Sequence, residues 1–164
     1  MTNIAREFLF DKSIPVVDAI DFLTERNQEL VSLFDEYSGA KFLAEKQFIA
    51  QNIIKTITIN LHLEDDIFYQ EVKRNLMDKG WTSAITMEHS IIKYLLSEIE
   101  TLDMDSAVYD IKIKVLGEHI RYLAKEKQTR FLPKVRSSNK IDRWRLGAQL
   151  AARQSFLENA FSHK

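Results

Sequence analysis

The chain has 164 residues, the usual length of a single domain with one hydrophobic core. It contains no Cys, which excludes disulfides, thiolate metal sites and cysteine nucleophiles, and its 4 Gly and 2 Pro are too few for a turn-rich β fold. The net charge of -1 provides no overall attraction to nucleic acid. The first ten residues lack the apolar run of a secretion signal, and no apolar stretch approaches the roughly 20 residues of a membrane span, so we expect a cytoplasmic protein without a membrane partner.

Helical periodicity follows the short N-terminal segment 1–14. Ser13, Ile14 and Pro15 form a start signal, and apolar residues then recur every three, four or seven positions as far as Gly39. A second, long helix is predicted over about 41–77, with a break at 78–80. A third helix is predicted to begin at Thr82 or Ser83 and to end around 103–105.

The rest of the chain is also predicted to be helical. Ser106 or Asp105 caps a fourth helix that continues towards Phe131, where Pro133 is expected to stop it. A last amphipathic helix is predicted over about 142–161. Long helices with short connections favour a single all-α domain over 1–164, an antiparallel up-down four-helix bundle with an added C-terminal helix.

Polar residues interrupt the inner, apolar faces of three of these helices at one level. They are Asn27 on the first helix, Asn60 and Glu64 on the second, and His89 on the third. Buried polar groups need partners, because an unpaired one costs about 1–3 kcal/mol. The pattern indicates either a hydrogen-bond network that gives packing specificity or a metal or cofactor site of the kind that bundles build from facing helices.

Several segments resemble the hemerythrin-like (HHE cation-binding) domain family. They are DAIDFLTERNQELVSLFDEY (18–37), NLHLEDDIFYQEV (60–72), EHSIIKYLLSEIE (88–100), LAKEKQTRFLPKVR (123–136) and, for the terminal helix of the family, RWRLGAQLAARQSFL (143–157). The likeness covers nearly the whole chain. It implies the four-helix bundle of that family and identifies six positions where the family holds two iron ions.

The resemblance also implies that most of the metal ligands are lost. The six positions fall on Asn27, Asn60, Glu64, His89, Leu123 and Lys127. Only Glu64 and His89 keep a ligand type, Leu123 has no donor atom, and an Asn amide is a poor iron ligand beside imidazole and carboxylate. These positions are therefore interpreted as a vestigial metal site.

Lys127 departs furthest from the family pattern, since it places an ammonium where the family has a bridging carboxylate. A buried Glu is tolerated only when it is paired or neutralised. We therefore predict a buried ion pair between Glu64 and Lys127, with His89, Asn60 and Asn27 hydrogen-bonded around it. The alternative is that Lys127 extends to solvent and Glu64 is hydrated.

The remaining histidines offer one rearranged site. His62 is about 200° around the helix from Asn60, so we expect it on the surface. His119 is one turn before Leu123, and Glu64, His89 and His119 could together form an open single-metal site. The other interpretation of His119 is a core histidine that a neighbour satisfies.

Charge is uneven along the chain, because residues 121–153 carry ten basic and two acidic side chains. Candidate anion-binding residues in this segment are Arg130, Lys134, Arg136, Lys140, Arg143 and Arg145. Such a block can bind nucleic acid or another anionic partner, or it can pair with acidic residues of its own chain. Only Trp144 is available to stack on bases, which makes nucleic acid the less favoured partner.

These observations favour a non-catalytic interaction or regulatory scaffold with a degenerate, metal-free site and an unidentified protein partner. No enzyme activity and no cofactor are expected. The alternative is an iron protein, with two irons or one metal, that senses or stores oxygen, nitric oxide or iron as the resemblance implies. A second alternative is an anion-binding module that uses the basic segment. The oligomeric state is not predicted.

Overall fold

The computed structural model describes residues 16–76 and 79–163, and in these ranges the regular structure is entirely helical. The all-α class predicted from the sequence is therefore confirmed. The elements are α2 (Ala19–Gly39), α3 (Leu43–Leu63), η1 (Glu64–Phe68), α4 (Tyr69–Leu76), α5 (Lys79–Ile99), α6 (Ala107–Glu126), η2 (Lys127–Phe131), α7 (Leu132–Ser137) and α8 (Arg143–Ser162). None of the described helices is long and apolar enough to cross a lipid bilayer.

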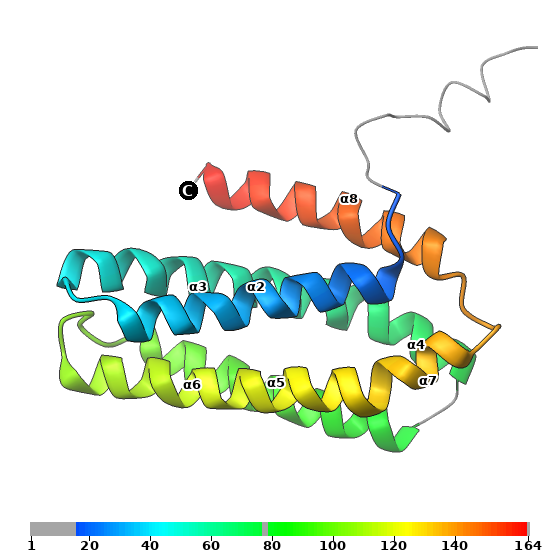
Figure 1. The fold of residues 1–164 in the computed structure, drawn as a ribbon, viewed down its shortest axis with the longest axis horizontal. Coiled ribbons are helices and arrows are strands. Elements are labelled where there is room, and N and C mark those ends of the chain that lie inside the picture. Colours follow the sequence, from blue (N-terminus) through cyan, green and yellow to red (C-terminus); the bar gives the residue numbers. More distant parts are fainter. Residues whose placement is uncertain (1–15, 77–78, 164) are drawn as a thin grey trace, which may run out of the picture.

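The long helices extend along the longest dimension of the molecule (Figure 1). The α2–α3 and α5–α6 connections lie at one end, whereas α4 and α7 lie at the other. Helix α2 contacts both α3 and α6, and α5 packs on α6. Helix α8 packs on α2 and α3 as an added element.

Local chemistry sets the helix starts, and one prediction of a start was wrong. Asp18 caps α2 through its side chain, which accepts from the Ile20 N–H at 2.8 Å. Residues 16–18 are not helical and Val16 is 87% exposed, so the helix does not begin at Pro15, which itself lies outside the described residues. Ser106, one of the two predicted caps, caps α6. Asp142 caps α8, which begins within one residue of its predicted start.

Other predicted boundaries were also wrong. The third helix ends at Ile99 instead of around 103–105. Helix α5 already begins at Lys79, and Thr82 is buried within its first turns instead of acting as the cap. Pro133 does not end the fourth helix, because it occupies the first turn of α7, where a missing N–H is tolerated. The helical segment that starts at Ala107 therefore continues to Ser137 through η2 and α7.

The second and fourth helical segments each contain one π-helical turn. The Tyr69 N–H bonds to the Glu64 carbonyl, and the Leu132 N–H bonds to the Lys127 carbonyl, each five residues apart. In both turns the first and last residues are buried, namely Glu64 with Phe68 and Lys127 with Phe131. The two phenylalanine rings meet edge to face with centroids 6.1 Å apart, so the two π turns pack directly on each other.

The hydrophobic core consists of two clusters with a polar layer between them. One cluster includes Leu23, Phe68, Ile85 and Phe131, and the other includes Leu30, Ile57, Ile92 and Leu123. The six vestigial positions lie on α2, α3–η1, α5 and α6–η2. Leu123 belongs to the second cluster, and the other five lie along these helices between residues of the two clusters. The fold therefore gathers its interior polar groups at one level, where the sequence interrupts its apolar stripes.

Candidate functional site: a buried ion-pair cluster

All six vestigial positions line one small cavity inside the helices. The cavity has a volume of about 20 Å³, and its walls include Asn27, Asn60, Glu64, His89, Leu123 and Lys127. A space of this size holds about one water molecule. The six positions that the sequence assigned to a lost metal site are thus neighbours in space, contributed by α2, α3, η1, α5, α6 and η2.

Glu64 and Lys127 form the ion pair that the sequence predicts. Lys127 Nζ donates to Glu64 Oε2 at 2.5 Å, and the two residues are only 6% and 2% exposed. Each is the first residue of a π turn, so the two turns place the carboxylate and the ammonium opposite one another. The alternative, with Lys127 extended to solvent and Glu64 hydrated, does not describe this structure.

Tyr69 adds a second donor to the same carboxylate. Its hydroxyl donates to Glu64 Oε2 at 3.3 Å, and its ring lies 5.5 Å from the His89 ring, centroid to centroid. Burial, reinforced by the Glu64 charge, raises the pKa of Tyr69 well above its ordinary value. Tyr69 is therefore a neutral donor at neutral pH, where Glu64 is ionised.

His89 lies between two carboxylates. Its Nδ1 is 2.6 Å from Asp65 Oδ1, and its Nε2 is 3.0 Å from Glu64 Oε2, although the second contact is outside hydrogen-bond geometry. Burial lowers the pKa of His89, but the hydrogen bond to Asp65 and the contact with Glu64 outweigh it, and the pKa is raised above 6.5. The imidazole is thereby favoured in its charged form.

The acidic partners are held in the ionised form. For Glu64 the cost of burial is outweighed by the Lys127 charge and the His89 contact, which lower its pKa to about 2. Asp65 also has a pKa of about 2, because His89 and Lys93 overcome its burial. Lys93 Nζ bonds to Asp65 Oδ2 at 2.7 Å, so a chain of alternating charges runs from exposed Lys93 to buried Lys127.

Asn60 and Asn27 do not join this chain, which corrects the prediction for both. Asn60 Oδ1 instead accepts from Arg26 Nε at 2.6 Å, and Arg26 is a buried cation on α2 that the sequence analysis missed. Asn27 is half-buried and lines the cavity, but within the described residues it has no hydrogen bond to the cluster. The cluster therefore sets Arg26, Lys127 and His89, whose charged form is favoured, against buried Glu64 and half-buried Asp65.

The structure does not bring the rearranged metal site together. His119 lies at the edge of α6, 3.9 Å from Glu88, with 37% of its side chain exposed, because Leu116, Ile120 and Leu123 occupy the inward face of that helix. It is absent from the cavity that Glu64 and His89 line. His62 is exposed and contacts Asp66 at 3.2 Å, as expected for a surface residue.

The donor set does not fit the two iron ions of the hemerythrin-like family. Of the six positions, Glu64 and His89 alone carry strong ligands, and one carboxylate oxygen of Glu64 is bonded to an ammonium. Across the described part of the chain, no three His, Asp or Glu side chains gather as metal ligands.

The basic segment is largely neutralised by the chain itself. Arg136 pairs with Asp21 at 3.1 Å, Arg143 with Asp18 at 3.3 Å, and Arg145 with Glu71 at 3.0 Å. Arg130 lies 3.6 Å from Glu126, and Lys134 lies over the Trp81 ring. Lys140 is exposed in the α7–α8 connection. These pairs link α8 and α7 to acidic residues elsewhere, which favours the intramolecular interpretation.

Comparison of the chain with protein-family models, with curated proteins and with solved structures gave no match.

Proposed function

We propose that the protein is a hemerythrin-like antiparallel four-helix bundle with an added C-terminal helix, in which a charge cluster replaces the di-iron site. In this proposal it is a cytoplasmic, non-catalytic interaction or regulatory scaffold that needs no cofactor. The observation that carries the proposal is the Lys127 ammonium bonded to buried Glu64 inside the cavity that all six vestigial positions line.

Charge compensation explains how such a site would be retained after its ligands changed. A carboxylate in a dry interior requires nearby positive charge, which metal ions supply in the family. Here Lys127 and His89 both contact the same Glu64 oxygen. Lys127, which departs from the family pattern, thus joins His89, which keeps it, in supplying the positive charge that the remaining carboxylate requires.

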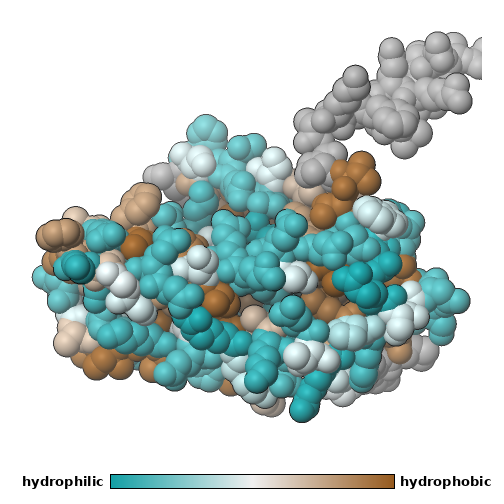
Figure 2. Space-filling model, viewed as in Figure 1, coloured by the Kyte–Doolittle hydropathy of each residue, from teal (hydrophilic) through white to brown (hydrophobic). Residues whose placement is uncertain are grey.

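Exposed apolar side chains support the interaction part of the proposal. Val108, Ile111, Val115 and Tyr122 are spaced by three, four and seven residues on α6 and are 37–58% exposed. A row on one helical face differs from the scattered apolar residues that normal surfaces carry. Figure 2 shows hydrophobic surface gathered towards the end of the molecule where α6 begins.

Thermal unfolding with and without metal tests this proposal. A ligand that binds only the folded protein raises the midpoint, by the equivalent of about 2.7 kcal/mol at a hundred times its dissociation constant. We expect the same midpoint in EDTA and in anaerobic ferrous iron. In the family, His stands at the positions of Asn60 and Leu123. The triple variant Asn60→His, Leu123→His and Lys127→Glu restores three of the four changed ligand positions, provides the contrast and should gain an iron-dependent shift. A rise of several degrees in the unmodified chain would favour the alternative iron protein.

A further inference from the structure

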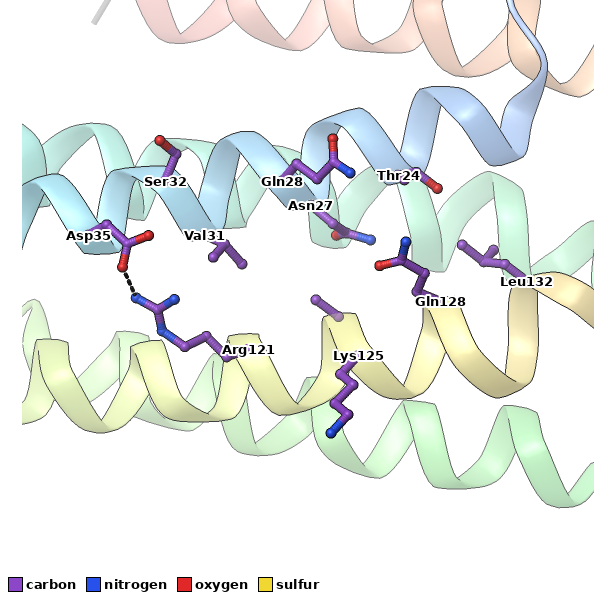
Figure 3. Close-up of a pocket in the computed structure, with 11 residues that line it drawn as sticks. Thr24, Asn27, Gln28, Val31, Ser32, Asp35, Arg121, Lys125, Gln128 and Leu132 are labelled. Atoms are coloured by element: carbon purple, nitrogen blue, oxygen red, sulfur yellow. Dashed lines mark hydrogen bonds and ion pairs between the residues drawn. The ribbon is translucent and has the colours of Figure 1, made fainter.

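A solvent-accessible groove lies between α2 and the segment formed by α6, η2 and α7. Its volume is about 460 Å³, within the range of small-molecule sites. Figure 3 shows side chains from both sides projecting into it. It shares only Asn27 and Ala124 with the buried cavity, so it is a separate space that reaches the polar layer from outside.

The sequence leaves this groove open because the facing positions are small or polar. On α2 they include Thr24, Gln28 and Ser32, and on the opposite segment Ala124 and Gln128. Bundles normally fill such facing positions with interlocking apolar side chains. Here the side chains are too short or too hydrophilic to close the seam between the two helices.

Two carboxamides project into the middle of the groove without partners. Asn27 on α2 and Gln128 on η2 point towards each other across the gap (Figure 3). In the part of the chain that the structure describes, neither side chain has a hydrogen-bond partner. Each amide offers a carbonyl acceptor beside two N–H donors.

The charged groups around the groove are not directed at its centre. Arg121 donates to Asp35 at 2.6 Å, and this ion pair closes one end. The Lys125 side chain lines the groove with its stem, while its amine points away from the gap (Figure 3). Val31 and Leu132 supply apolar contact on either side of the amides. This combination matches an uncharged ligand better than an anion.

We propose that this groove binds a small, uncharged, planar molecule with adjacent hydrogen-bond donor and acceptor groups, of the nucleobase or aromatic carboxamide class. Asn and Gln side chains pair in a bidentate manner with such edges, as they do with adenine. The apolar side chains would contact the faces of the ring. None of the groove residues takes part in the ion pairs of the cluster, and only Asn27 and Ala124 also line the buried cavity, so this inference does not depend on the proposed function.

Titration of the ¹⁵N-labelled full chain with uracil, nicotinamide and adenosine tests the inference by NMR. We expect saturable shifts for at least one of these probes in the side-chain amide signals of Asn27 and Gln128. Asn27→Leu and Gln128→Leu should each weaken binding about tenfold, the effect of losing one hydrogen bond to a partly buried ligand. Gln51→Leu, on the exposed face of α3, is the matched control and should bind unchanged.

The spectra of the variants show at once whether they remain folded, and Gln128→Leu changes an exposed residue. Absence of saturable shifts for all three probes at millimolar concentration would overturn the inference. So would shifts that persist equally in both Leu variants. Tighter binding of benzoate, abolished by Arg121→Leu, would instead identify an anion site and would also overturn it.

Discussion

Lys127 is the residue on which the stability of the interior depends most directly. Removing its ammonium leaves Glu64 ionised and buried with a partner lost. Breaking one side of a buried pair costs about 3–5 kcal/mol, so Lys127→Ala should lower the free energy of unfolding in urea by about that amount. Lys125→Ala, two residues away on the exposed surface, should change it by less than about 0.5 kcal/mol.

The double variant Glu64→Gln with Lys127→Met separates a specific pair from general packing. It removes both charges, so it should be more stable than Lys127→Ala despite carrying two substitutions. Equal destabilisation by Lys127→Ala and Lys125→Ala would contradict the account of this pair.

The pH dependence of stability follows from the three titrating groups of the cluster. Glu64 and Asp65 have pKa values of about 2, below the ordinary 4.5 and 3.8, so their stabilisation is present above those ordinary values and is lost as the pH falls towards 2. The pKa of His89 is raised, so its stabilisation is complete below 6.5 and is lost as the pH rises through the raised pKa. Urea unfolding from pH 3 to pH 9 should show greatest stability between about pH 4.5 and 6.5.

His89→Gln provides the control for the alkaline side of this profile. The variant keeps a polar side chain but cannot titrate, so the decline above pH 6.5 should become shallower while the acid decline remains. An unchanged alkaline decline in His89→Gln would show that another group is responsible.

At this scale the sequence predicts the pair but not its surroundings. The pair was predicted through the resemblance to the hemerythrin-like family, which implies that Glu64 and Lys127 stand where two bridging carboxylates face each other. The sequence did not predict the contacts of Asp65, Tyr69 and Arg26 in this cluster. The directions of the Asp65 and Tyr69 side chains depend on the π turn. The role of Arg26 depends on which neighbour Asn60 bonds to. Adjacent residues on an ordinary α-helix point about 100° apart, and one inserted residue changes which of them faces inward.

Among the elements, α8 is positioned by a close approach to the start of α2. A Cβ added at Gly147 would lie 1.8 Å from the Val17 carbonyl oxygen, a backbone atom that cannot rotate away. Gly147→Ala should therefore force the two elements apart and cost about 1–3 kcal/mol or more, measured by urea unfolding. Val17 and Gly147 are far apart in sequence, so this variant reports on tertiary packing and not on helix propensity.

Gly39→Ala is the matched control, since nothing lies within 4 Å of an added Cβ at the end of α2. It should be neutral or stabilising by up to about 1 kcal/mol, because Ala is the better helix former. Equal losses in the two variants would show that the contact between α8 and residue 17 contributes nothing to stability.

Most helices were predictable because their apolar periodicity and caps are local signals. Ser106, one of the two caps predicted for α6, bonds the Tyr109 N–H, and α8 begins within one residue of its predicted start, where Asp142 bonds the Arg145 N–H. The π turns were not predictable, since a single inserted residue leaves the hydrophobic pattern nearly unchanged. Pro133 was misassigned as a stop because its tolerance in a first turn depends on where η2 ends.

For the whole molecule, the two hydrophobic clusters and the polar layer between them form a consistent arrangement. Burying this layer would cost folding free energy if its polar groups lacked partners. Four of its residues do contact a partner of complementary chemistry, namely Asn60, Glu64, His89 and Lys127. The basic segment is neutralised in the same way, by acidic residues on α2 and α4. Such long-range pairs join residues whose contact depends on the complete fold, and the sequence alone could offer them only as one of two interpretations.

The central claim is that the chain's own cations occupy the site that two iron ions hold in the hemerythrin-like family. The most direct test is the iron content of the full chain after anaerobic ferrous loading and removal of free metal, followed by its absorbance in air. We predict no stoichiometric iron and no charge-transfer band. Stoichiometric iron, about one or two ions per chain, with a band that responds to oxygen would contradict the account.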